Sequence, residues 1–286
     1  MTLHLELLPE VDWSVRIVDL GSGSILFSHN ENQLLSTASI GKVFALIELA
    51  ERLRDGTLAL DQPLDRRRVT PVADSGLWQH LTTDVLPLTD VAALVGSVSD
   101  NWATNVLIDL LGLDAIRARA REWAPGGSDL VDVVRGLRGP DDPPHLSLGC
   151  AADLTTVLAR LWADRATPDA TGSRVLAWLA PGMDLSMVAS AWHQDPLSHA
   201  EEYAGPILTH KTGTNLGVRA DIGIIDSAAN NVANGAAHSS TGADTTSRAA
   251  AYAVLANWTE NPPGHRRDEV MDALHTIGRT LRAHLA

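Results

Sequence analysis

The order of strand-like and helix-like segments is the feature that most constrains the fold of this chain. Residues 13–20 and 25–28 are rich in β-branched and apolar residues and flank a Gly-Ser-Gly-Ser turn, which predicts a strand pair. Strand patterns return at residues 207–212, 219–225 and 251–258. Because these segments lie near the two ends of the chain, they predict one sheet that is built from both ends.

Helical periodicity dominates the region between these strands. Apolar residues recur three and four positions apart up to Gly56, which closes a first helix, and further helices are predicted over about residues 89–98, 102–111 and 151–162. Residues 126–149 differ, because they have little periodicity and are rich in Gly, Pro and Asp. They predict a loop that is unusually long for a simple connection.

Residues 266–285 place apolar side chains on one helical face, which is typical of a helix that covers a sheet. We therefore predict an α/β (α+β) fold, in which an antiparallel sheet of about five strands is flanked by terminal helices and interrupted by an all-helical domain. The predicted sheet domain is discontinuous and comprises residues 1–57 and 184–286. The predicted helical domain comprises residues 58–183.

The composition excludes several classes of partner. The formal net charge of −13 argues against nucleic acid and anionic membranes, which need a basic face. No apolar run reaches the roughly eighteen residues of a membrane span. The N-terminal residues lack the basic and long apolar segments of a secretory signal. We expect a cytoplasmic protein, or a secreted one if a leader has been removed.

Metal and cofactor sites are not expected either. Cys150 is the single cysteine, so no internal disulfide and no thiolate cluster can form. The histidines do not show His-Glu-x-x-His or a comparable ligand spacing. Two further segments have no assigned role: residues 192–203 resemble an insertion, and the small polar residues 230–246 are expected to form a mobile excursion.

The lysines are the most informative residues for function, because the chain contains twenty arginines but only Lys42 and Lys211. Arginine stays protonated at any practical pH, whereas a buried lysine can lose its proton and act as a base. Ser39 and Lys42 lie three residues apart at the start of a predicted helix, so their side chains share one face. A neutral lysine there can activate the serine hydroxyl as a nucleophile.

Two other triplets accompany this pair. Ser99-Asp100-Asn101 lies between two predicted helices, where a serine can relay a proton and an asparagine can bind an amide; taken alone, it is better explained as a helix cap. Lys-Thr-Gly at residues 211–213 lies on a predicted strand. Each motif is weak by itself, but the three in this order and on these elements favour a catalytic site.

With these motifs, the chain resembles the serine β-lactamase and penicillin-binding protein superfamily, and within it the class A β-lactamases most. The likeness extends to residues 55–61, 99–108 and 205–225, and it covers roughly residues 13–260. It implies the β-lactamase/transpeptidase-like fold, with the site between the sheet and the helices. It also implies a serine hydrolase that forms an acyl-enzyme.

The resemblance assigns roles to the motif residues. Ser39 would be the acylated nucleophile, Lys42 its proton acceptor and Ser99 the proton relay. Asn101 would contact the substrate, and the backbone N–H groups of Ser39 and Thr214 would form the oxyanion hole.

Substrate binding would involve a second set of residues. Lys211 and Thr212 would anchor a carboxylate, and Gly213 would let the substrate backbone approach closely. Trp78 falls where the family has an aromatic residue at the cleft mouth, although a core tryptophan fits equally well. Arg219, on the next strand, would help to hold the carboxylate or would be an ordinary surface arginine.

One family feature is missing. Class A enzymes carry a glutamate, and an asparagine four residues later, in the loop that activates and holds the deacylating water. Residues 126–149 contain neither. Of the four aspartates there, Asp132 is nearest by counting and is the tentative base, although a shorter side chain reaches its water less well. We therefore predict acylation followed by slow deacylation.

The sequence leaves three functions open. The first is a β-lactamase-like serine hydrolase that acts on a β-lactam or related amide, a small molecule carrying a carboxylate. The second is an intracellular esterase, D-amino-acid peptidase or acyltransferase that acts on a natural metabolite. The third is a non-catalytic binder that has kept the pocket. The absence of a leader favours the second and third, because a resistance or cell-wall enzyme works outside the cytoplasm.

Overall fold

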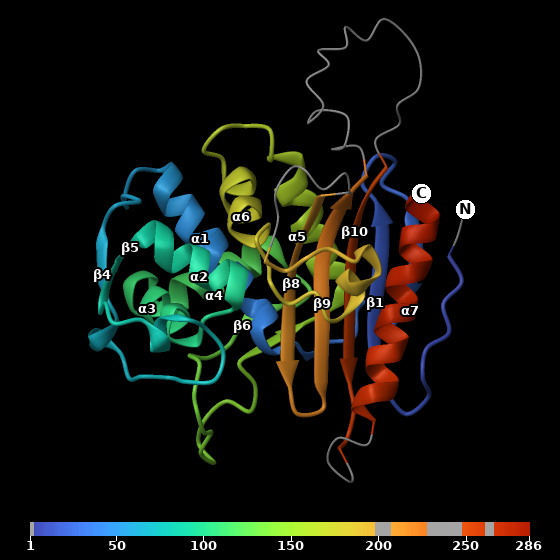
Figure 1. The fold of residues 1–286 in the computed structure, drawn as a ribbon, viewed down its shortest axis with the longest axis horizontal. Helices are drawn as coiled ribbons and strands as arrows, with labels where there is room; N and C mark the ends of the chain where they lie inside the picture. The colour runs from blue at the N-terminus through green and yellow to red at the C-terminus, as the bar shows by residue number, and fades with distance from the viewer. Residues whose placement is uncertain (1–2, 198–206, 228–247, 261–265) are drawn as a thin grey trace, which may run out of the picture.

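The computed structural model describes residues 3–197, 207–227, 248–260 and 266–286. Its centre is a five-stranded antiparallel sheet with the strand order β2-β1-β10-β9-β8 (Figure 1). The strands are β1 (Asp12–Asp19), β2 (Ile25–His29), β8 (Ile207–Asn215), β9 (Val218–Asp226) and β10 (Ala249–Asn257). The N-terminal strand β1 pairs with the C-terminal strand β10 along its whole length. The predicted sheet built from both ends is thereby confirmed.

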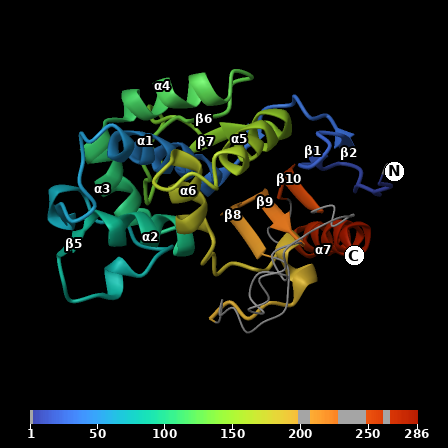
Figure 2. The same ribbon diagram turned by 90° about the horizontal axis from the view of Figure 1, so that it is seen from above.

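Each face of the sheet packs against helices (Figure 2). One face contacts α7 (Arg267–Leu285) and the short 3-10 helix η4 (Val188–Trp192), and the other contacts α5 (Ala151–Ala163). Successive residues of a strand point to opposite faces, so β10 contributes to both cores. Tyr252 lies in the core beside α7, whereas Ala253 lies in the core beside α5.

The remaining helices gather around α1 (Lys42–Arg54), which is buried over most of its length. The helices that contact it are α2 (Leu88–Val98), α3 (Asn101–Leu111), α4 (Leu113–Trp123) and α6 (Thr171–Leu179). One apolar core joins α1 to the sheet face that carries α5. The domain boundaries at residues 57/58 and 183/184 stay a prediction.

The loop predicted over residues 126–149 contains two short strands, β6 (Asp129–Leu130) and β7 (Ser147–Gly149). They form a three-stranded sheet with β3 (Leu35–Ser36), in the order β3-β7-β6. A second small sheet pairs β4 (Pro63–Asp65) with β5 (Val85–Pro87). Strands of two or three residues leave no periodic pattern in a sequence, so the prediction missed them.

Some expectations lie partly or wholly outside the described residues. Residues 230–246 are outside them, and of residues 192–203 only 192–197 are described. None of the described helices is both long enough and apolar enough to span a membrane. Cys150 is buried directly before α5, where burial raises the pKa of its thiol. It is therefore a poor nucleophile in this environment.

Candidate active site

Ser39 lies in the single-turn 3-10 helix η1 (Ala38–Gly41), directly before α1. Ala38 has a φ of 48°, in the left-handed region that costs free energy for a residue with a side chain. Ser147 on β7 stabilises this turn: its hydroxyl donates to the Ala38 carbonyl at 2.5 Å and lies 2.8 Å from the Thr37 hydroxyl. The 126–149 segment therefore helps to position Ser39. A single serine leaves no sequence pattern that would indicate this role.

Two glycines permit the close packing of this turn. A side chain at Gly213 would collide with the Thr37 carbonyl, and one at Gly41 would collide with Ser147. Strand β8 can therefore lie directly against η1. The sequence interpretation assigned Gly213 to the approach of a substrate; in the structure, the backbone that approaches it is the protein's own.

Lys42 is fully buried behind Ser39. Its Nζ donates to the Ser99 carbonyl at 2.6 Å and to Asn101 Oδ1 at 2.8 Å, and it lies 3.2 Å from Ser99 Oγ. Burial lowers the pKa of Lys42 well below its usual range, and the positive charge of Lys211 lowers it further. A lysine with a strongly lowered pKa can be neutral and accept a proton. None of the described hydrogen bonds joins Lys42 to Ser39 itself.

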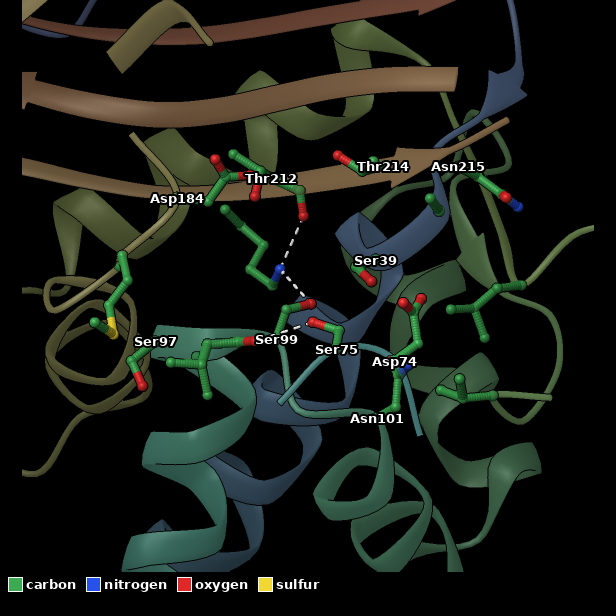
Figure 3. A pocket seen from close by; sticks show the side chains of 18 of the residues that line it. Ser39, Asp74, Ser75, Ser97, Ser99, Asn101, Asp184, Thr212, Thr214 and Asn215 are labelled. Carbon is green, nitrogen blue, oxygen red and sulfur yellow. Dashed lines mark hydrogen bonds between the residues drawn. The ribbon is translucent and has the colours of Figure 1, made fainter. Parts of the chain in front are cut away.

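Lys211 on β8 approaches the same hydroxyl from the sheet side. Its Nζ donates to Ser99 Oγ at 2.9 Å and to the Thr212 carbonyl at 2.8 Å (Figure 3). Burial lowers the pKa of Lys211 to about 8, although the Asp184 and Asp221 carboxylates counteract this shift. The Ser99 hydroxyl therefore connects the two lysines of the chain.

The Ser-Asp-Asn triplet forms the helix cap that the sequence offered as one explanation, and its role in proton relay and substrate binding stays a prediction. Ser99 ends α2 with a φ of 56°, and Asp100 caps α3 by accepting from the Ala103 N–H at 2.8 Å. Asp100 also accepts from the backbone N–H groups of residues 77 and 78, at 2.8 Å each. This capping holds Ser99 and Asn101 against the lysines.

Residues of all three motifs open onto one pocket with a volume of about 740 Å³. Its lining includes Ser39, Ser99, Asn101, Lys211, Thr212 and Thr214. Four charged residues that the sequence did not single out also line it: Asp74, Arg135, Arg138 and Asp184. They come from three separate segments of the chain, so no single local motif could have indicated all four.

Asp132, the tentative base, is not among the lining residues. Its carboxylate accepts from Arg135 Nε at 2.7 Å, from Arg138 Nη1 at 2.5 Å and from the Val133 N–H at 2.8 Å. Burial alone would raise the pKa of Asp132, but the hydrogen bonds from Arg135 and Arg138 outweigh burial and lower it. A carboxylate held in this way is a weak base, and the geometry disfavours the expected role.

The other loop aspartates do not replace it. Asp129 pairs with Arg117 at 2.9 Å, and Asp142 pairs with Arg135 at 3.2 Å. Neither these two nor Asp141 lines the pocket. The loop instead contributes two guanidinium groups, Arg135 and Arg138, to the pocket wall.

Trp78 and Arg219 lie away from the pocket lining. Trp78 is fully buried, and its Nε1 donates to the Thr83 carbonyl at 3.0 Å, which agrees with the core alternative. Arg219 Nη1 donates to the carbonyls of Asn215 and Val218 at 2.9 and 2.8 Å. Neither residue lines this pocket, and a substrate contact for Trp78 or Arg219 stays a prediction.

Behind Lys211, a buried polar network connects three strands. His210 Nδ1 lies 3.3 Å from Asp221 Oδ1, and the Tyr252 hydroxyl donates to the same oxygen at 3.0 Å. Burial raises the pKa of Tyr252 well above its usual range. Among the described residues, no group of three or more His, Cys, Asp or Glu side chains is arranged to hold a metal ion.

Comparison with known proteins identifies the family. A family model described as the β-lactamase enzyme family matches residues 8–285. The chain belongs to this family. No match is found among curated protein sequences. The resemblance drawn from the three motifs is thus confirmed, and by family and fold the protein is a β-lactamase-like serine hydrolase.

Solved structures show how far the β-lactamase fold is shared. A β-lactamase from Sphaerobacter thermophilus is 24% identical, with a TM-score of 0.72 over 93% of this chain and 89% of that chain. A class A β-lactamase from Mycobacterium abscessus is 20% identical, with a TM-score of 0.72 over 96% and 94%. A mutant of PBP-A, solved as an acyl-enzyme complex with penicillin G, is 19% identical, with a TM-score of 0.70 over 96% and 90%.

Proposed function

We propose that this protein forms an acyl-enzyme at Ser39 with a β-lactam or related amide and hydrolyses that acyl-enzyme slowly. The observation that carries the proposal is the Ser99 hydroxyl, which contacts both buried lysines in the pocket that contains Ser39. Family membership and the penicillin complex of PBP-A add support from outside the chain.

Acylation follows from this arrangement. Ser39 Oγ attacks the carbonyl carbon, its proton passes to Lys42 Nζ, and the carbon–nitrogen bond of the amide breaks. Ser99 then gives its proton to the leaving nitrogen and regains one from a neighbouring lysine. The backbone N–H groups of Ser39 and Thr214 would stabilise the negative oxygen of the tetrahedral intermediate.

The two buried lysines would divide their work. Lys42 acts as the base, because its lowered pKa leaves a lone pair available. Lys211, with a pKa of about 8, stays mostly protonated at neutral pH and can bind a substrate carboxylate together with the Thr212 hydroxyl. Both lysines contact the Ser99 hydroxyl, so a carboxylate bound at Lys211 would lie close to the bond that breaks.

The 126–149 loop offers no comparable base for the deacylation step. The loop aspartates are paired with arginines or lie off the pocket lining, and the loop contains no glutamate. A missing general base costs about two to four powers of ten in rate. The acyl-enzyme should therefore accumulate.

Intact-protein mass spectrometry tests the proposal. The wild-type protein and the Ser39→Ala variant are incubated with benzylpenicillin and, separately, with a chromogenic ester. We expect a persistent penicillin adduct on the wild type and none on the variant. Absence of any adduct or turnover with both compounds would contradict the proposal and favour the non-catalytic binder.

A further inference from the structure

Asp74 is a charged pocket residue that the acylation mechanism does not use. It lines the pocket, and Figure 3 shows its carboxylate directed inward beside Ser39. The side chain is exposed, and it makes no hydrogen bond or ion pair with any residue that the structure describes. The carboxylates of Asp132, Asp100 and Asp184, by contrast, each accept hydrogen bonds from protein groups.

The backbone around Asp74 is fixed. Asn101 donates from its side chain to the Ala73 carbonyl at 3.1 Å and from its backbone to the Ser75 carbonyl at 3.0 Å. Asp74 itself has a φ of 81°, a left-handed conformation that costs free energy for a residue other than glycine. Strain of this kind is concentrated at functional sites, where the surroundings hold it in place.

The cations that line the pocket form no ion pair with Asp74. Arg135 pairs with Asp132 and Asp142, and Lys211 donates to Ser99. Asp74 thus has no ion-pair partner among the described residues, although its charge acts at longer range on Lys42. An unpaired carboxylate on a concave wall attracts a positive group from solution.

We propose that Asp74 binds an ammonium group of the substrate, so that the preferred substrate is an amide with a free amino group near its scissile carbonyl. This inference rests on the proposed acyl-enzyme function. Figure 3 shows Asp74 on the side of Ser39 away from Thr212, so the ammonium and a carboxylate would occupy opposite ends of the pocket. Such a substrate is a zwitterion, as a short peptide with free amino and carboxyl termini is, so this charge arrangement also fits the peptidase alternative.

The first test compares two penicillins that differ by one amino group. Ampicillin carries an α-amino group on its side chain and benzylpenicillin does not. We expect Asp74→Asn to lower the ratio of their acylation rate constants, ampicillin to benzylpenicillin, about three- to fivefold at pH 6 and low salt, the range of an exposed ion pair. Asparagine tolerates a left-handed backbone, so this variant should fold. The difference should shrink at high salt.

Two control variants separate the local effect of the Asp74 carboxylate from the general effect of losing one negative charge. Asp74→Glu keeps the carboxylate and should preserve most of the ratio. Asp114→Asn removes an exposed carboxylate in the first turn of α4, away from the pocket lining, and should leave the ratio unchanged. A ratio that does not change in Asp74→Asn, or that falls equally in Asp114→Asn, would overturn the assignment.

A second readout does not depend on acylation. In the Ser39→Ala background, the dissociation constants of both penicillins are measured by calorimetry with and without Asp74→Asn, and the ratio should change by the same factor. If the wild type forms no adduct but this ratio changes, the proposed function fails and the ammonium site stands. If Asp74→Asn slows deacylation of both penicillins equally while the ratio is constant, Asp74 is a base and the ammonium site is refuted.

Discussion

The two walls of the pocket use their cations in opposite ways. On the wall formed by α1, the Ser-Asp-Asn turn and β8, two lysines are buried around one hydroxyl, and burial lowers the pKa of both. On the wall formed by residues 126–149, Arg135 and Arg138 surround Asp132 and lower the pKa of that carboxylate. Lysine can become a neutral base when it is buried, whereas arginine cannot. In the proposed mechanism, the first wall therefore starts the reaction, and the second offers no base to finish it.

The 126–149 segment can be judged separately for its structural role and for its chemical role. The 126–149 segment contributes to the fold of the site, because the Ser147 hydroxyl contacts the turn that presents Ser39. The same segment places no available carboxylate in the pocket. The structural role of this segment therefore does not depend on a carboxylate in the pocket.

The largest expected effect concerns the lysine wall. Lys42→Arg should slow acylation by about two to four powers of ten, because a guanidinium stays protonated and cannot serve as a base. Rapid-quench mass spectrometry with benzylpenicillin measures the rate. Lys211→Arg is the matched control, since a permanent cation can still bind a carboxylate. Equal losses of acylation rate in the two variants would contradict the division of roles.

The next prediction changes the arginine wall. Val134 lines the pocket, and Asn105 fixes its backbone through two hydrogen bonds of 2.8 Å. Val134→Glu should place a carboxylate in the pocket and speed deacylation about ten- to a hundredfold, the lower part of the range for a general base. Val134→Gln has the same shape without the base and should not accelerate it. Similar rates in the two variants would mean that a missing base does not limit deacylation.

A smaller effect is expected from pH. Because the pKa of Lys211 is lowered to about 8, its positive charge is present below that pH and is lost above it. Binding of benzylpenicillin to the Ser39→Ala variant should weaken above pH 8, by at most about tenfold per pH unit. Calorimetry from pH 6 to pH 10 measures this. When Lys211→Arg is added to the Ser39→Ala variant, the weakening above pH 8 should disappear. If binding still weakens, another group is responsible for the titration.

The smallest effect on catalysis is predicted for Asp132→Asn. Because the Asp132 carboxylate is occupied by arginines, the lifetime of the acyl-enzyme should not change. The free energy of unfolding should nevertheless fall by about 1–3 kcal/mol, since charge-assisted hydrogen bonds to a buried group are lost. Denaturant titration and adduct decay measure the two quantities. A clearly longer adduct lifetime would restore Asp132 as the base.

The sequence predicted those parts of the fold and site that leave a local pattern. The central strands and the terminal helix were recognisable from periodicity, and the three motifs are each contiguous or nearly so. Asp74 and Asp184 reach the pocket only through tertiary packing, so their positions could not be predicted. Counting along the chain placed Asp132 in the right loop, but counting does not give the direction of a side chain. Its partners Arg135 and Arg138, three and six residues later, decide that direction.

The most direct test of the account follows both halves of the reaction in one experiment. Wild-type protein is mixed with excess benzylpenicillin, and samples are quenched at times from milliseconds to hours. The intact mass of the protein and the amount of hydrolysed product are measured in each sample. We predict one rapid stoichiometric burst of adduct on Ser39, followed by turnover that is slower than the burst by at least about a hundredfold. Rapid turnover without an accumulating adduct would contradict the account and would require a deacylation base in this pocket.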